Sequence, residues 1–194
     1  MQFILFAITY PIIWILSRLP MRILYMKSDF FYFLIYYVFR YRKQVVLDNL
    51  KLAFPEKPEV ELLRIRKKFF KHLMDLMVES VKAFSISEKE ILKRYTYSNP
   101  ELVNKYAAEG RSIALMGAHQ SNWEWSISLP KVLNIDMYGA YTKLNNTYYE
   151  KVIRDSREKF GVIGYKTSEM VRGMQKRFSN KQQGAYILLS DQSP

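Results

Sequence analysis

The first seventeen residues, MQFILFAITYPIIWILS, form an apolar run without a charged side chain. As a helix this run is about 26 Å long, the low end of the length that crosses a bilayer core. Arg18, Arg22 and Lys27 follow it, and basic residues beside an apolar helix favour the cytoplasmic side. The pattern predicts an amino-terminal membrane helix, or membrane anchor, over residues 1–19. The alternative is a core helix of a soluble protein.

The next region, residues 20–94, is predicted to be helical and to lie close to the membrane. Its uncharged stretch 30–39 is too short to span a bilayer and suits an interfacial or buried helix before a basic cluster. After a proline-marked break at 53–59, apolar residues at helical spacing predict one long helix. Its predicted apolar stripe is Leu62, Ile65, Phe69, Leu73, Met77, Val81 and Phe84.

From residue 95 onward, short apolar runs alternate with helical patterns. The runs at 112–117, 136–141, 162–165 and 184–190 read as strands, and the segments between them read as helices. This alternation predicts an α/β domain over 95–194 with a mostly parallel or mixed sheet flanked by helices. Ser87 with Glu90 and Thr147 with Glu150 have the spacing of capping boxes. The chain stops just after the last strand, so we expect an amino-terminal fragment of a longer protein.

Composition narrows the possible chemistry. The chain has no cysteine, which excludes disulfides, thiolate zinc sites and a cysteine nucleophile. Its two histidines, His72 and His119, are too far apart for a zinc-binding H-E-x-x-H helix, so we expect no metal. The net charge of +12 attracts anionic partners such as lipid, nucleic acid or an acidic protein. Nucleic acid is disfavoured because the cations are scattered and accompany no recognition motif.

The stretch "MGAHQSNWEW" places a glutamate five residues after a histidine. On one continuous helix or strand, His119 and Glu124 would point apart. They can cooperate only if a strand ends before His119 and a helix begins before Glu124, as the pattern predicts. A carboxylate that binds one imidazole nitrogen leaves the other nitrogen free to take a proton from a substrate hydroxyl. The spacing alone is weak, since a histidine and a glutamate in one loop are often structural.

Four stretches, in order, resemble the late acyltransferases of lipid A biosynthesis, within the lysophospholipid acyltransferase superfamily. "GAHQSNWEW" resembles the H-x4-D/E motif, in its lipid A form with N-W-E. "RKQVVLDNLKLAFPE" resembles the early R…N-L…F-P-E segment. "YTKLNNTYYEKVIRDSREKFG" and "LLSDQSP" resemble the later motifs. The resemblance covers nearly the whole chain.

The resemblance implies a membrane-bound acyltransferase that moves a fatty acyl chain from an acyl carrier protein thioester to a hydroxyl of a lipid A precursor. It implies His119 as general base and Glu124 as the carboxylate that orients it. It places Arg157, Lys143, Asn145 and Asp191 at substrate-binding positions, with Arg157 binding phosphate or stabilising an oxyanion. The resemblance implies that the enzyme needs no cofactor and uses acyl–acyl carrier protein or acyl-CoA as its co-substrate. The implied location is the bacterial inner membrane, with the catalytic part on its cytoplasmic face.

Two alternatives remain at this stage. The acceptor can be another glycolipid, an aminolipid or a lysophospholipid, because acceptor contacts are spread over loops. The chain can also be a non-enzymatic, basic, membrane-anchored module that binds anionic lipid. Such a module has no need of His119 or Glu124, so the chemistry of these two residues separates the classes.

Overall fold

The computed structural model describes residues 2–191 of the chain. These residues form two compact units. One unit contains the residues up to Ile12 together with those from Ala83 onward, and the other is Ile13–Lys82. The sheet and the candidate site belong to the first unit, and the second is entirely helical.

The helical unit is built from four helices and one π-helical turn. They are the end of α1 (Gln2–Arg18), then α2 (Met21–Phe33), the turn Leu34–Val38, α3 (Lys43–Ala53) and α4 (Glu59–Ala83). Pro20 lies immediately before α2, where its fixed φ suits a helix start. Buried Met21, Leu24, Tyr36 and Phe70 contribute to the core. Two polar contacts join α2 to α4, from Ser28 to Asp75 and from Tyr25 to Glu79.

The face of α4 that is buried differs from the predicted one. Leu62 is buried as expected, but the stripe continues through Phe70, Met74 and Val78. The predicted Phe69 and Met77 are 44% and 58% exposed. The prediction failed because α4 has apolar residues on two adjacent faces, and the spacing within the helix cannot say which of them meets a partner.

The predicted membrane-spanning helix at the amino terminus is wrong. Residues 2–18 do form a helix, but none of the helices in the described part of the chain is long and apolar enough to cross a membrane. Helix α1 ends at Arg18, two residues before Pro20, and has 17 residues in all. At its amino-terminal end, Phe6 packs against Tyr148 and Tyr149, and Thr9 hydrogen-bonds to Tyr149.

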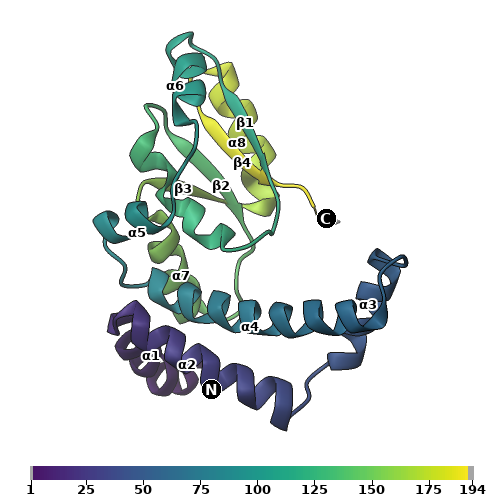
Figure 1. Ribbon diagram of the computed structural model, residues 1–194. Helices are drawn as coiled ribbons and strands as arrows, with labels where there is room; N and C mark the ends of the chain where they lie inside the picture. Colours follow the sequence, from purple (N-terminus) through teal and green to yellow (C-terminus); the bar gives the residue numbers. More distant parts are fainter. Residues whose placement is uncertain (1, 192–194) are drawn as a thin grey trace. The chain divides into compact units, whose positions relative to one another are not determined.

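The α/β prediction is confirmed by a four-stranded sheet in the order β1-β4-β2-β3, with every neighbouring pair parallel (Figure 1). The strands are β1 (Ile113–Gly117), β2 (Met137–Tyr141), β3 (Val162–Lys166) and β4 (Ala185–Leu189). Strand β4, the last in the chain, lies between β1 and β2. All four carboxyl ends therefore meet at one edge of the sheet, where α/β folds bind ligands.

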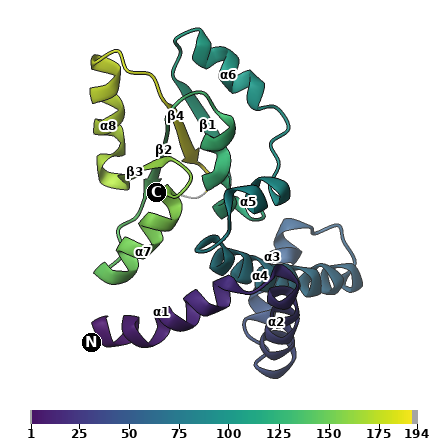
Figure 2. The same cartoon turned by 90° about the vertical axis from the view of Figure 1, so that its left-hand side faces the viewer.

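Helices cover both faces of this sheet. Helix α8 (Thr167–Ser179) lies on one face, and α6 (Pro100–Ala108) with the 3-10 helix η2 (Trp123–Val132) lies on the other (Figure 2). Under α8, Met170 packs on Tyr138 and Tyr186, which are paired neighbours on β2 and β4. The alternate strand residues Met137 and Ala185 are also buried. Burial on both faces is what a parallel sheet requires.

Two remaining helices test the predicted caps. Helix α5 (Glu88–Arg94) is capped as expected, since the Ser87 hydroxyl accepts from the Glu90 N–H. Helix α7 (Thr147–Glu158) is capped by Asn146 instead of Thr147. The Asn146 side chain accepts from two backbone N–H groups, while Glu150 accepts from the Leu144 N–H. An asparagine and a threonine in succession offer two possible caps, and asparagine is the more favourable N-cap residue of the two.

Candidate active site

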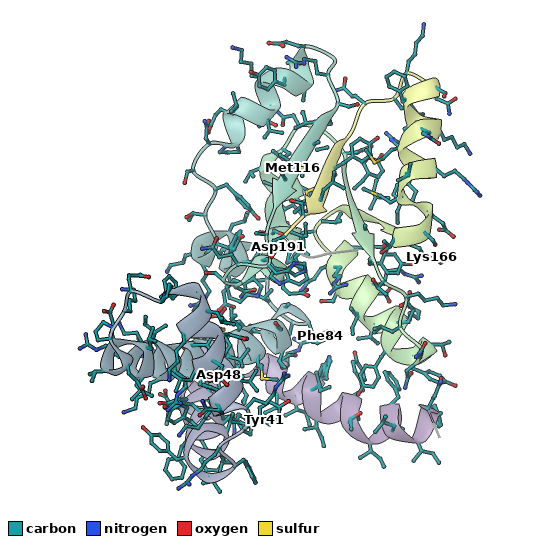
Figure 3. The ribbon with its side chains drawn as sticks, turned by 90° about the vertical axis from the view of Figure 1, so that its right-hand side faces the viewer. Tyr41, Asp48, Phe84, Met116, Lys166 and Asp191 are labelled. Carbon is teal, nitrogen blue, oxygen red and sulfur yellow. The ribbon has the colours of Figure 1, made fainter. Side chains whose placement is uncertain are left out.

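His119 follows β1 by two residues, and Asp191 follows β4 by two residues. Because β1 and β4 are parallel, with Gly117 paired to Leu189, these equal offsets bring the two residues together. The Ser190 N–H donates to the Gly117 carbonyl and carries the alignment beyond the strands. Figure 3 marks Asp191 beyond the end of β4, beside the strand that carries Met116.

Asp191 binds His119 through both of its carboxylate oxygens. One oxygen lies 2.8 Å from His119 Nδ1, and the other accepts the His119 backbone N–H at 2.9 Å. An ionised carboxylate only accepts hydrogen bonds, so in the neutral imidazole Nδ1 carries the proton and Nε2 keeps its lone pair. The two side chains are about one third exposed. His119 is therefore oriented as an accessible base.

These contacts lower the pKa of the Asp191 carboxyl below its ordinary value of 3.8, chiefly through the bond from the His119 ring and then through the backbone bond. Because the pKa is lowered, these hydrogen bonds stabilise the fold at pH values above the unfolded pKa of about 3.9. This stabilisation is lost as the pH falls through the folded pKa.

We expect His119→Ala to raise the pKa of Asp191 only part of the way back to its ordinary value, because the backbone donor remains. A ¹³C NMR titration of the carboxyl measures this, and an unchanged titration contradicts it.

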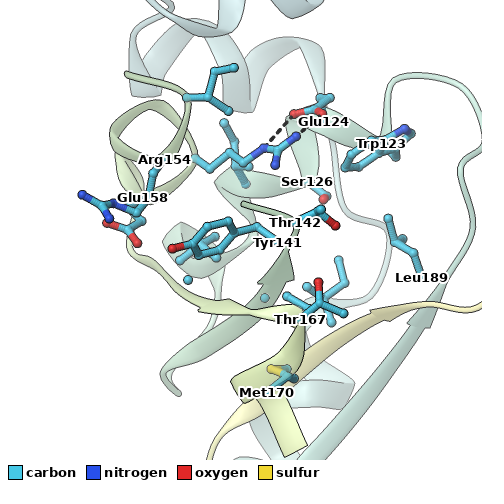
Figure 4. Close-up of a pocket in the computed structure, with 18 of the residues that line it drawn as sticks. Trp123, Glu124, Ser126, Tyr141, Thr142, Arg154, Glu158, Thr167, Met170 and Leu189 are labelled. Atoms are coloured by element: carbon cyan, nitrogen blue, oxygen red, sulfur yellow. Dashed lines mark hydrogen bonds and ion pairs between the residues drawn. The ribbon is translucent and has the colours of Figure 1, made fainter. Parts of the chain in front are cut away.

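Glu124 lies in the first turn of η2 and binds Arg157 of α7. Two guanidinium nitrogens donate to the two Glu124 oxygens at 2.7 Å and 3.4 Å. Dashed lines mark these contacts at Glu124 in Figure 4. The predicted contact between Glu124 and His119 is not formed, since the carboxylate on His119 is Asp191. Ser121, between them, has a left-handed φ of 50°. The chain thus reverses after His119, and Glu124 points towards α7.

Trp123 lies next to one member of each side-chain pair, His119 of the first and Arg157 of the second. It was not predicted from the sequence as a site residue. Its ring meets the His119 ring edge to face at 4.9 Å, and the Arg157 guanidinium lies 5.9 Å from its centroid. The signal was present, because Trp123 belongs to the N-W-E part of the motif that carries the resemblance. An aromatic ring between a histidine and an arginine limits the positions that both can adopt.

A pocket of about 690 Å³ opens at this edge of the sheet, a volume typical of ligand sites. His119 and Arg157 line it. So do Trp123 and Glu124, together with Arg154 and Glu158 of α7 (Figure 4). Most of the remaining wall is apolar, formed by Ile127, Met137, Leu144, Ile153, Val162, Met170, Val171, Ile187, Leu188 and Leu189. An apolar pocket with a base at its wall suits a substrate that combines a hydrocarbon chain with a polar reacting group.

Two of the other predicted binding residues, Lys143 and Asn145, do not join this arrangement, whereas Asp191 does. Lys143 and Asn145 are exposed in the loop between β2 and α7, and among the described residues their neighbours Thr142 and Leu144 line the pocket instead. Asp191, predicted to bind substrate, lies on His119. Within residues 2–191, no group of three or more histidine, aspartate or glutamate side chains is placed to hold a metal ion.

Comparison with known proteins identifies the family. No curated protein matches the chain. A family model described as bacterial lipid A biosynthesis acyltransferase matches residues 2–193, which is nearly the whole sequence. The resemblance seen in the motifs is thereby confirmed, and with it an enzymatic rather than a purely lipid-binding role. The chain belongs to the bacterial lipid A biosynthesis acyltransferases, and it is an acyltransferase.

Proposed function

We propose that this protein moves a fatty acyl chain from the thioester of acyl carrier protein to a hydroxyl group of a lipid A precursor, with His119 as general base. The observation that carries the proposal is the His119 ring at the wall of an apolar pocket, with the Asp191 carboxylate on Nδ1. In the neutral ring this contact leaves Nε2 to accept a proton. This is the arrangement that activates a hydroxyl nucleophile at neutral pH.

The proposed step is a direct transfer. Nε2 of His119 takes the proton of the acceptor hydroxyl as its oxygen attacks the thioester carbonyl carbon. The carbonyl becomes a tetrahedral oxyanion, which requires a nearby positive charge, and Arg157 in the pocket wall supplies one. The carbon–sulfur bond then breaks, and the thiol leaves with the proton from His119. The products are an ester and a free thiol.

Two properties support the choice of donor. The apolar wall of the pocket can bury an acyl chain, with a gain of about 0.8 kcal/mol for each buried methylene. The net charge of +12 favours an acidic carrier protein, because complementary charge speeds association. Acyl-CoA, which is also anionic, is the alternative donor.

The acceptor is proposed to enter from the loop between β2 and α7. Lys143 and Asn145 are exposed there and can bind the polar part of a glycolipid. We further propose that the catalytic part works at the cytoplasmic face of the bacterial inner membrane, where anionic lipid meets the basic surface. The exposed side chains of α1, such as Phe3, Ile8 and Ile12 at 55–62%, can rest on an apolar phase without crossing it.

An acceptor panel tests this function. The protein, in vesicles, receives radiolabelled acyl–acyl carrier protein or acyl-CoA with a tetra-acylated lipid A precursor, another glycolipid, an aminolipid or a lysophospholipid. We expect transfer to the lipid A precursor, and faster transfer from the carrier protein than from acyl-CoA. Transfer to a different acceptor would support the acyl-transfer reaction but refute a lipid A precursor as its acceptor. No transfer to any acceptor refutes the proposed function.

A further inference from the structure

The site contains two carboxylates, Asp191 and Glu124, which bind different partners. Asp191 comes to His119 because β1 and β4 are paired in register and each strand is followed by the same offset. Two hydrogen bonds hold it there, at 2.8 Å and 2.9 Å. This contact is built by the sheet and does not depend on the helix that follows β1.

Glu124 belongs to a different set of contacts. It begins η2 and makes its hydrogen bonds with Arg157, which approaches with two guanidinium nitrogens. A two-point carboxylate–guanidinium contact fixes the plane as well as the position of the arginine. Both side chains remain one quarter to one third exposed, so Arg157 can still meet a substrate in the pocket.

Trp123 brings the two pairs to one place. Its ring contacts the His119 ring and also faces the Arg157 guanidinium. The base with Asp191 and the arginine with Glu124 therefore lie around the same indole and line the same pocket. In the proposed reaction His119, with Asp191, transfers the proton, and Arg157, with Glu124, supplies the positive charge.

We infer that the two carboxylates divide the work: Asp191 orients His119, and Glu124 is a positioning residue that holds Arg157 where the oxyanion forms. The inference rests on the proposed function, because it assigns roles within that reaction. Glu124 therefore affects catalysis through Arg157, although it shares the H-x4-E spacing with the base. Asp191 affects catalysis through His119, although 72 residues separate them in the sequence.

Double-mutant cycles separate the two pairs. Acyl transfer is measured for Glu124→Gln, Arg157→Gln, Asp191→Asn, His119→Ala and the combinations of these changes. We expect Asp191→Asn to lose about 10²–10⁴-fold in rate and no more than His119→Ala, because Asp191 acts through the base. We expect Arg157→Gln to lose about 10²–10³-fold, as when an oxyanion donor is removed.

The combinations decide between the pairings. The double variant Glu124→Gln/Arg157→Gln should be no slower than Arg157→Gln alone, because residues that act as one unit do not add. In the same way, Asp191→Asn/His119→Ala should match His119→Ala. The losses in Glu124→Gln/Asp191→Asn should multiply, because those residues act on different groups.

A spectroscopic measurement excludes a merely structural effect. The chain has two histidines, so a His72→Ala background leaves one imidazole, that of His119, for ¹⁵N NMR. We expect Nδ1 to carry the proton in the parent, Asp191→Asn to change this tautomer and Glu124→Gln to leave it unchanged. If Asp191→Asn unfolds, Asp191→Ala provides the same test, and thermal unfolding is recorded for every variant.

The failure of this inference differs from that of the proposed function. If the parent transfers no acyl chain, or His119→Ala is as active as the parent, the function itself is refuted. If His119→Ala is inactive but the Glu124 and Arg157 losses multiply, the division of work is refuted. A change of the His119 tautomer in Glu124→Gln would refute it as well, while leaving the base in place.

Discussion

Replacing His119 by alanine is expected to slow acyl transfer by about 10²–10⁴-fold, the usual contribution of a general base. The acceptor hydroxyl would then attack with its proton in place, and the leaving thiol would receive no proton from the ring. The loss should appear in kcat, because in the proposed mechanism His119 acts only on the reacting hydroxyl, while the apolar wall of the pocket would hold the acyl chain. The measurement is the rate at saturating donor and acceptor, with the unfolding temperature recorded alongside.

The chain provides a matched control for this change. His72 is an exposed residue of α4 in the helical unit. His72→Ala should transfer acyl chains at the parental rate. If His119→Ala keeps more than about a tenth of the parental kcat, His119 is not the general base, given the range above. Equal losses in both variants would point to a general effect of removing a histidine.

Replacing Phe70 by alanine is expected to destabilise the helical unit by about 3–5 kcal/mol. Phe70 is 1% exposed and meets the buried Tyr36 ring at 5.4 Å, so its removal leaves a cavity between α4 and the π-helical turn. Hydrogen exchange of the α4 backbone amides measures the effect, because it reports the opening of this unit by itself. Faster exchange along α4 is the expected result.

The neighbouring Phe69 is the control for this second prediction. It has the same side chain on the same helix but is 44% exposed. Phe69→Ala should cost about 1 kcal/mol or less, since surface changes are mild. An equal effect of the two substitutions would mean that the buried face of α4 is not the one through Phe70, Met74 and Val78.

Many elements of this fold could be predicted from local patterns. The alternation of short apolar runs with helical patterns predicted a mostly parallel or mixed sheet, and the sheet is parallel. Ser87 correctly predicted the start of α5. Such features depend on dihedral preferences and spacing within a few residues, which a single sequence carries. The family motif likewise placed His119 in the loop after a strand, where the structure has it.

The partners of those elements could not be predicted in the same way. The resemblance to the H-x4-D/E motif favoured Glu124 as the partner of His119, and the spacing alone was weak support. The structure pairs His119 with Asp191 and Glu124 with Arg157. Both contacts depend on strand register and on the packing of α7, which are properties of distant segments.

The sequence by itself determined that this chain has an α/β acyltransferase core, a histidine after the first strand and a strongly basic surface. It did so because periodicity, motif and charge are local or additive quantities. Tertiary structure decided which face of α4 is buried and which carboxylate hydrogen-bonds to His119. Both outcomes depend on how segments far apart in the chain pack together. The free energy of that packing cannot be inferred from any single stretch of residues.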